Sequence, residues 1–157
     1  KRLYLLMILE LKSRKIFKWN LTEYPSREFV RQQIIDFTYD DEDTKTLIYD
    51  NAPQFTSIDY SDYGITGVNI SIASPNMNSF VERLNGTIRR EALDHFLLFS
   101  EKQVRQIIKK YVVYYNIQRM HQGIDKIPDA EIQESSGVIG KEQILSGLHH
   151  HYYRSSA

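Results

Sequence analysis

The chain has 157 residues, in which 20 Lys and Arg balance 20 Asp and Glu, 41% of the residues are hydrophobic and Cys is absent. This length and hydrophobic share suit one domain with a core, and they argue against two domains or a disordered chain. The longest apolar run, residues 3–9, is far shorter than the roughly 20 residues that cross a bilayer, which excludes a membrane span. Without Cys, a metal would be bound by carboxylates or imidazoles, and a reducing compartment such as the cytoplasm fits.

The zero net charge conceals an asymmetry along the chain. Residues 36–62 are strongly acidic, with Lys45 as the single base, whereas residues 83–119 are strongly basic. Two interpretations follow: ordinary solvated faces, or a carboxylate site beside a surface that binds phosphates. The chain begins at Lys1 and enters an apolar run at once, so we expect it to be a piece of a longer protein.

The first part of the chain predicts two strands that form a hairpin, one helix and one further strand, over residues 3–9, 16–21, 25–37 and 47–49. The first strand is almost continuously aliphatic, as in a strand buried on both faces, and the second alternates as a half-exposed strand does. Pro25 suits a first helical turn, and Val30, Ile34 and Phe37 lie on one helix face. The acidic cluster that follows ends this helix, and the last strand stops at Asp50.

The second part predicts a strand over residues 65–72, a polar loop over 73–78, a helix that begins near Ser79, and a helix capped by Ser100. Each helix has an apolar stripe at helical spacing. The stripes consist of Phe80, Leu84 and Ile88 in the first helix and of Val104, Ile107, Ile108, Tyr111 and Tyr115 in the second. From Gln122 onward the composition predicts a loosely packed tail with one short helix near residues 141–145.

Two acids are candidates for metal chemistry. Asp50 follows a predicted strand, and Glu82 shares one helix face with Asn78, Asn85 and Arg89. Such a face can hold a metal ion and a phosphate together. Hard divalent ions prefer oxygen ligands, and two ions about 4 Å apart can activate a hydroxyl nucleophile and stabilise the leaving oxygen in phosphodiester chemistry.

Each acid also has a purely structural interpretation. Ser79 and Glu82 have the spacing of a capping box, in which the acid only satisfies the helix start. Asp50 before Asn51 is typical of a turn. Gly86 inside the predicted helix suggests a backbone that another group approaches closely. Pattern alone leaves these alternatives open.

Four stretches resemble the bacterial insertion-sequence transposases with a retroviral-integrase-like catalytic core, called DDE enzymes after their three acids. They read LYLLMILELKSRKIFKWNLT, IYDNAPQF, SPNMNSFVERLNGTIRREALDHF and YYNIQRMHQGI. The similarity runs from Leu3 to about Pro128. The third and fourth stretches are specific because they match the family's pattern at many positions together: Asn78, Glu82, Arg83, Gly86, Thr87, Arg89, Arg90, Tyr114, Tyr115, Asn116, Arg119 and His121.

The resemblance implies an α/β fold of the ribonuclease H-like type, a mixed sheet flanked by helices, with residues 1–128 as the catalytic core and 129–157 as a C-terminal tail. It implies DNA strand cleavage and strand transfer that depend on Mg²⁺ or Mn²⁺, with Asp50 and Glu82 as the second and third catalytic and metal-binding acids. The implied partners are DNA, as transposon ends and target, and further copies of the chain. The competing interpretation is a non-catalytic remnant or nucleic-acid-binding domain with the same fold.

One departure from the family is serious. The family's first catalytic Asp lies on a central strand that precedes residues 3–9, and that strand is missing from this chain. Glu10 is the nearest acid, but it aligns with a strand end where the family has no catalytic acid. We therefore expect the 157-residue chain to be inactive by itself. We also expect a second copy, an upstream segment or a shifted strand to fill the place of the missing strand, since its loss would leave unpaired backbone on both neighbours.

The resemblance also suggests which residues contact DNA: Asn85, Arg89, Arg90, Lys102, Arg105 and Lys109. The two arginines near Glu82 can bind phosphate bidentately. The basic residues of the second helix either add to salt-dependent DNA affinity or only keep that helix solvated. We interpret the histidines at 149–151 as a native tail without a ligand role, and His95 and His121 as structural hydrogen-bonding residues.

Overall fold

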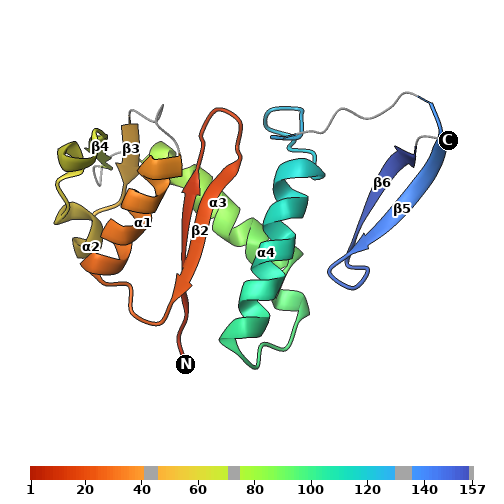
Figure 1. The fold of residues 1–157 in the computed structure, drawn as a ribbon, viewed down its shortest axis with the longest axis horizontal. Helices are drawn as coiled ribbons and strands as arrows, with labels where there is room; N and C mark the ends of the chain where they lie inside the picture. Colours follow the sequence, from red (N-terminus) through yellow and green to blue (C-terminus); the bar gives the residue numbers. More distant parts are fainter. Residues whose placement is uncertain (41–45, 71–74, 130–135, 156–157) are drawn as a thin grey trace. The chain divides into compact units, whose positions relative to one another are not determined.

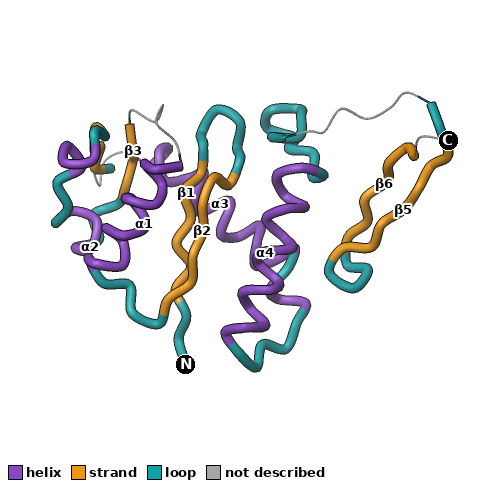
Figure 2. The backbone as a smooth tube through the Cα atoms, viewed as in Figure 1, coloured by secondary structure: helices purple, strands orange, loops and turns teal. Residues whose placement is uncertain are grey.

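The computed structural model describes residues 1–40, 46–70, 75–129 and 136–155 (Figure 1). The chain divides into two compact units: unit 1 comprises Lys1–Met7 and Lys18–Glu82, and unit 2 comprises Ile8–Phe17 and Arg83–Ala157. Helices and strands are mixed along the chain (Figure 2), as expected for the α/β class. Within the described ranges, no helix has the length and apolar character needed to cross a membrane.

The chain begins with the predicted hairpin. β1 (Tyr4–Leu9) and β2 (Ile16–Thr22) pair in a two-stranded sheet. The turn between them is closed by a backbone hydrogen bond in which Glu10 N donates to Lys15 O at 2.9 Å. Arg14, with a φ of 66°, takes the left-handed conformation that lets the turn reverse the chain.

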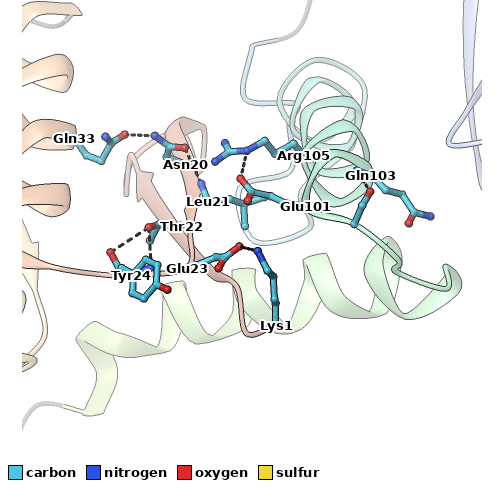
Figure 3. Close-up of polar contacts among 11 residues, drawn as sticks. Lys1, Asn20, Leu21, Thr22, Glu23, Tyr24, Gln33, Glu101, Gln103 and Arg105 are labelled. Carbon is cyan, nitrogen blue, oxygen red and sulfur yellow. Dashed lines mark hydrogen bonds and ion pairs between the residues drawn. The ribbon is translucent and has the colours of Figure 1, made fainter.

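The first helix, α1 (Arg27–Asp40), buries the stripe that its spacing predicts, since Val30, Ile34 and Phe37 are nearly inaccessible. It begins two residues after Pro25, because Ser26 serves as its N-cap and accepts a hydrogen bond from the amide of Phe29 at 3.1 Å. A side-chain hydrogen bond of 2.9 Å between Asn20 and Gln33 joins β2 to this helix (Figure 3). A polar contact thus links the helix to the hairpin.

A parallel strand pair follows. β3 (Thr46–Tyr49) pairs with β4 (Thr66–Asn69) in the register Thr46↔Thr66 to Tyr49↔Asn69. The short helices α2 (Pro53–Thr56) and η1 (Tyr60–Tyr63) form the connection between them. Tyr60 stacks on Tyr49 with ring centroids 4.5 Å apart, and it lies so close to Gly67 that a Cβ there would be 2.5 Å from its ring. Gly67 therefore makes room for the aromatic residue that covers the strand pair.

β4 is shorter than the predicted strand over residues 65–72, whose last two positions lie outside the described residues. Among the described residues, the β1–β2 and β3–β4 pairs share no strand-to-strand hydrogen bonds. A mixed sheet that lacks its central strand would be divided in this way. β1 is paired on one side and its residues 5–9 are half-buried, so the idea that another segment fills the gap remains a prediction.

The next helix begins earlier than predicted. α3 (Pro75–Glu91) includes residues that we expected in a polar loop, so the predicted start near Ser79 is wrong. Proline suits the first turn of a helix, because its fixed φ is already helical and its missing N–H would have no intrahelical partner there. The expected apolar stripe is present, with Leu84 and Ile88 buried.

After the short η2 helix (Leu93–His95), α4 (Glu101–Ile117) begins where the sequence predicts it. Its N-cap Ser100 accepts a hydrogen bond from the amide of Gln103. All five predicted core positions are buried, and two further residues join them; the buried set is Val104, Ile107, Ile108, Tyr111, Val112, Tyr115 and Asn116. The prediction of this helix and of its core face is confirmed.

The C-terminal part differs from the prediction. Instead of a short helix near residues 141–145, the chain forms an antiparallel hairpin of β5 (Val138–Ile144) and β6 (His149–Ser155). Leu145, Ser146 and Gly147 all have positive φ, at 51°, 59° and 90°, and they make the turn. Ser146 and Gly147 favour a turn at this point, and this preference is stronger than the weak helical pattern of residues 141–145.

Candidate functional site

Asp50 lies directly after β3, at the carboxyl edge of the parallel pair, and its side chain is exposed. The edge is held by two hydrogen bonds: Ile70 N donates to Tyr49 O at 2.8 Å, and Asn51 Nδ2 donates to Ile70 O at 2.9 Å. Oδ1 of Asp50 accepts a hydrogen bond from the amide of Ala52 at 3.0 Å. Asp50 therefore forms the turn that its position suggests, while Oδ2 has no hydrogen-bond partner among the described residues.

Tyr60 packs against this edge, because its ring stacks on the ring of Tyr49. Burial raises the pKa of the Tyr60 hydroxyl, and the negative charge that Tyr49 and Asp50 can carry raises it further. The hydroxyl donates a hydrogen bond to the carbonyl of Phe55 at 3.1 Å. Tyr60 is thus a neutral residue that packs against this edge.

Glu82 is exposed on α3. Its capping-box interpretation is wrong, because the helix begins at Pro75 and Ser79 lies inside it. Within the described part of the chain, the side chain of Glu82 makes no hydrogen bond or ion pair. Asn85 is exposed three residues further along, and the side chain of Asn78 lies outside the described residues.

Asp50 and Glu82 supply carboxylate oxygens, the donor type that Mg²⁺ and Mn²⁺ prefer. Among the described residues, however, no group of three acidic or histidine side chains is placed to hold a metal ion. Glu10 is engaged elsewhere, since its carboxylate accepts a hydrogen bond from Ser13 in the β1–β2 turn. Asp50 and Glu82 therefore have the donor type that fits a divalent metal, but the described residues supply no third ligand beside them.

The cationic residues of α3 lie after Glu82, in unit 2. The side chain of Arg90 folds back over Gly86, where a Cβ would lie 2.8 Å from Nη1, so the group that approaches the glycine is the helix's own guanidinium. Nε of Arg89 is 3.8 Å from a carboxylate oxygen of Asp94, with both side chains more than half exposed. Such an exposed pair adds little stability and leaves the guanidinium accessible.

On α4, the predicted DNA-contacting residues are not equally available. Lys102 and Lys109 are exposed. Arg105 donates from Nε to Glu101 at 2.7 Å, one helical turn away (Figure 3). Part of its charge is therefore balanced within the helix.

A polar cluster at the end of α3 was not predicted from the sequence. The two oxygens of Glu91 accept hydrogen bonds from Arg119 Nη2 at 2.6 Å and Nε at 2.8 Å, and Tyr111 Oη donates to the same carboxylate at 2.7 Å. Burial alone would raise the pKa of Glu91, but the hydrogen bonds from Arg119 and Tyr111 outweigh it and lower the pKa. Burial and the bond to Glu91 raise the pKa of Tyr111. Arg119 is one of the positions that match the family's pattern, but no sequence pattern identifies Glu91 as its partner.

Two histidines have structural roles in unit 2. His121 is buried, its Nε2 lies 3.0 Å from the carbonyl oxygen of Tyr115, and burial lowers its pKa. His149 stacks on Tyr114, with ring centroids 4.4 Å apart and an interplanar angle of 13°. Nε2 of His149 lies 2.6 Å from the carbonyl oxygen of Glu91. This histidine therefore ties the β5–β6 hairpin to the ends of two helices.

Comparisons with known proteins agree with this architecture. Residues 63–128 match the family model described as the integrase core domain. The chain is 33% identical over 86 residues to an uncharacterized 39.2 kDa protein of insertion element IS476 from Xanthomonas euvesicatoria, in an alignment that covers 52% of this chain and 25% of the relative. It is 29% identical over 130 residues to the transposase for insertion sequence element IS904 from Lactococcus lactis, covering 78% of this chain and 51% of the relative.

The chain thus spans between a quarter and about half of the length of these curated relatives. Among solved structures, a simian T-cell lymphotropic virus intasome in complex with PP2A regulatory subunit B56 gamma shares the fold, with a TM-score of 0.63 and 11% identity over 96% of this chain and 60% of that one. The resemblance that the sequence predicts is therefore confirmed, and the chain has a ribonuclease H-like core similar to those of insertion-sequence transposases and retroviral integrases.

Proposed function

We propose that the chain supplies the catalytic core of a transposase that cuts and joins DNA strands with divalent metal ions. The similarity to integrase cores supports this, as does the position of Asp50 at the carboxyl edge of a parallel strand pair. The observation that carries the proposal is Glu82, an exposed acid in the interior of a helix whose carboxylate makes no polar contact with any other described residue. Its carboxylate oxygens are therefore available, and they are the donor type that Mg²⁺ and Mn²⁺ prefer.

In this proposal Asp50 and Glu82 hold Mg²⁺ or Mn²⁺ together with a third acid. Such ions, when bound, lower the pKa of an attacking hydroxyl and stabilise charge on the leaving oxygen. Water attacks the phosphorus in line, and the P–O3′ bond breaks to leave a 3′-hydroxyl. That hydroxyl then attacks a phosphodiester of the target, whose own P–O3′ bond breaks as the strands are joined.

The cations of unit 2 position the DNA. Arg89 and Arg90 offer guanidinium groups for phosphate oxygens, and Asn85 offers an amide donor on the same helix. Lys102 and Lys109 add exposed positive charge on α4, and Arg105 contributes less because it is paired with Glu101. Residues 1–128 then form the catalytic core and 129–157 a C-terminal extension, and several copies of the chain assemble on the transposon ends and target.

The direct test compares two forms of the protein in a strand-transfer assay with Mn²⁺. We expect the 157-residue chain to join no strands, because two acids bind metal weakly without a third. We expect a longer form, in which the strand with the third acid precedes Lys1, to be active. In that form Asp50→Asn or Glu82→Gln should lower the rate by more than about 100-fold with unchanged DNA affinity, since each removes a metal ligand.

Asp62→Asn, which changes an exposed acid outside the proposed site, is the matched control and should keep the activity. Strand transfer by the 157-residue chain alone would contradict the requirement for a third acid. The proposal itself would be contradicted by a longer form that binds DNA in a salt-sensitive way, is unaffected by Asp50→Ala and Glu82→Ala, and joins no strands. That second outcome would identify a non-catalytic DNA-binding module.

A further inference from the structure

The β5–β6 hairpin has two chemically different faces. Paired residues of an antiparallel sheet share a face, and successive residues of one strand alternate between faces. The register pairs Lys141 with Tyr152 and Ile139 with Arg154. We call the face that these pairs define the cationic face, and its residues are Ile139, Lys141, Gln143, His150, Tyr152 and Arg154.

The opposite face contacts the rest of unit 2 at the end of the hairpin next to the turn. Ile144 and its partner His149 lie on it. Ile144 is 9% exposed, and the ring of His149 stacks on Tyr114 while Nε2 meets the carbonyl oxygen of Glu91. The hairpin is therefore anchored to the rest of unit 2 through this face, which leaves the cationic face accessible.

The cationic face combines positive charge with an exposed aromatic ring. Tyr152 is 58% exposed, and Nζ of Lys141 lies 5.9 Å from the centroid of its ring. Nη1 of Arg154 donates to the carbonyl of Gly137 at 3.2 Å, which orients the guanidinium and leaves its other N–H groups available. The one acid of the hairpin, Glu142, lies on the opposite face, so no carboxylate of the hairpin neutralises the cationic face.

We propose that the cationic face binds the sugar-phosphate backbone of DNA. Lys141 and Arg154 are diagonal neighbours on adjacent strands, about 7–8 Å apart at such positions. That separation corresponds to about two nucleotide steps of one strand, which rise about 3.4 Å each along the helix axis. Tyr152 lies beside them and offers a flat ring to a sugar or an unpaired base. An acidic peptide would engage the two cations but would have no use for the ring, so the chemistry favours nucleic acid.

This inference rests on the proposed function in one respect, which is the choice of DNA as the ligand. The test measures binding of a labelled DNA duplex, and of a single strand of the same sequence, to the 157-residue chain by fluorescence anisotropy across a salt series. K141Q/R154Q should weaken duplex binding about 3–10-fold at low salt. It should also reduce the slope of log K against log salt by about 1.8, at about 0.9 for each phosphate that the variant no longer neutralises.

The matched control is K12Q/K126Q, which removes the same charge from exposed lysines elsewhere in unit 2 and should leave the slope unchanged. Tyr152→Leu should weaken single-strand binding about 5-fold or more and duplex binding less, because stacking needs an accessible base. Thermal unfolding of each variant checks that the chain still folds. In the unmodified chain, ultraviolet crosslinks to DNA should map to residues 138–155.

A slope for K141Q/R154Q equal to that of the control would overturn the inference, as would crosslinks confined to other residues. Binding of polyglutamate as tight as that of DNA, with no effect of Tyr152→Leu, would point to an acidic protein partner and would also overturn it. None of these measurements requires metal or strand cleavage. Failure of the proposed chemistry at Asp50 and Glu82 would therefore leave this result intact, and the reverse also holds.

Discussion

Two acids of α3 show how differently the surroundings of a carboxylate can be arranged. Glu91 receives three hydrogen bonds, two from Arg119 and one from Tyr111, and its side chain is 30% exposed. Glu82, on the same helix, is exposed, and its carboxylate makes no polar contact with any other described residue. The first arrangement stabilises a fold, and the second leaves an acid available for a ligand. Residue type and helical position alone do not separate these cases.

The Glu91 cluster makes stability depend on pH. Because its pKa is lowered in the folded chain, Glu91 stabilises the fold above its ordinary pKa of 4.5, and this contribution is lost as the pH falls through the lower folded value. Glu91→Gln should therefore lower the free energy of unfolding by about 1–3 kcal/mol at pH 7, where it leaves Arg119 without its counter-charge. The difference from the unmodified chain should shrink as the pH falls below 4.5 and through the lower pKa of the folded chain, because Glu91 then becomes neutral.

Urea unfolding across a pH series measures this difference. Glu142→Gln changes an exposed carboxylate of the same unit and serves as the control. A Glu91→Gln difference that is constant from pH 7 to the acid range would show that the charge of Glu91 contributes nothing to the fold.

At the scale of elements, one side chain of α4 completes the edge of a strand. The amide of Asn116 accepts a hydrogen bond from Ile16 N and donates one to Ile16 O, both at 2.9 Å. Asn116 is buried, so both backbone groups at the start of β2 depend on it. The side chain acts as a short substitute for a neighbouring strand.

Asn116→Ala should lower the free energy of unfolding by about 2–3 kcal/mol, because it leaves two buried backbone groups without partners. It should also speed hydrogen exchange at the amide of Ile16 selectively. Gln106→Ala, at an exposed position of the same helix, should change neither quantity appreciably. Equal protection of the Ile16 amide in both variants would contradict this role for Asn116.

Elements with strong periodicity could be predicted from the sequence, because their burial pattern is local. This holds for the β1–β2 hairpin, for α1 with its stripe of Val30, Ile34 and Phe37, and for α4 behind its Ser100 cap. The start of α3 was missed because Ser79 and Glu82 imitate a cap, while the true start at Pro75 lies in a polar stretch.

The β5–β6 hairpin was missed for a different reason. Its Gly, Ser and His content is typical of a tail, and the residues that secure it are distant in the sequence: His149 meets Glu91 and Tyr114. The Glu91–Arg119 pair could not be predicted either, since no local pattern links the two positions. For the candidate site, the sequence identified Asp50 at a strand end and Glu82 on a helix, but not which helix residues balance one another's charge.

At the scale of the whole molecule, the strands of the expected mixed sheet are present as two separate pairs, β1–β2 and β3–β4. Among the described residues there is also no third side chain placed to complete a metal site. Under the proposed function, one further strand that bears the third acid joins the two pairs and completes both the sheet and the metal site.

The central claim is that Asp50 and Glu82, both in unit 1, bind the same divalent ion. Titration of the isotope-labelled 157-residue chain with Mn²⁺, followed by paramagnetic broadening of amide signals, tests this claim without requiring activity. The account predicts that signals next to Asp50 and Glu82 broaden together over one Mn²⁺ range, and that Asp50→Asn removes the broadening at Glu82 as well. Broadening at one acid only, or broadening at Glu82 that persists in Asp50→Asn, would contradict it.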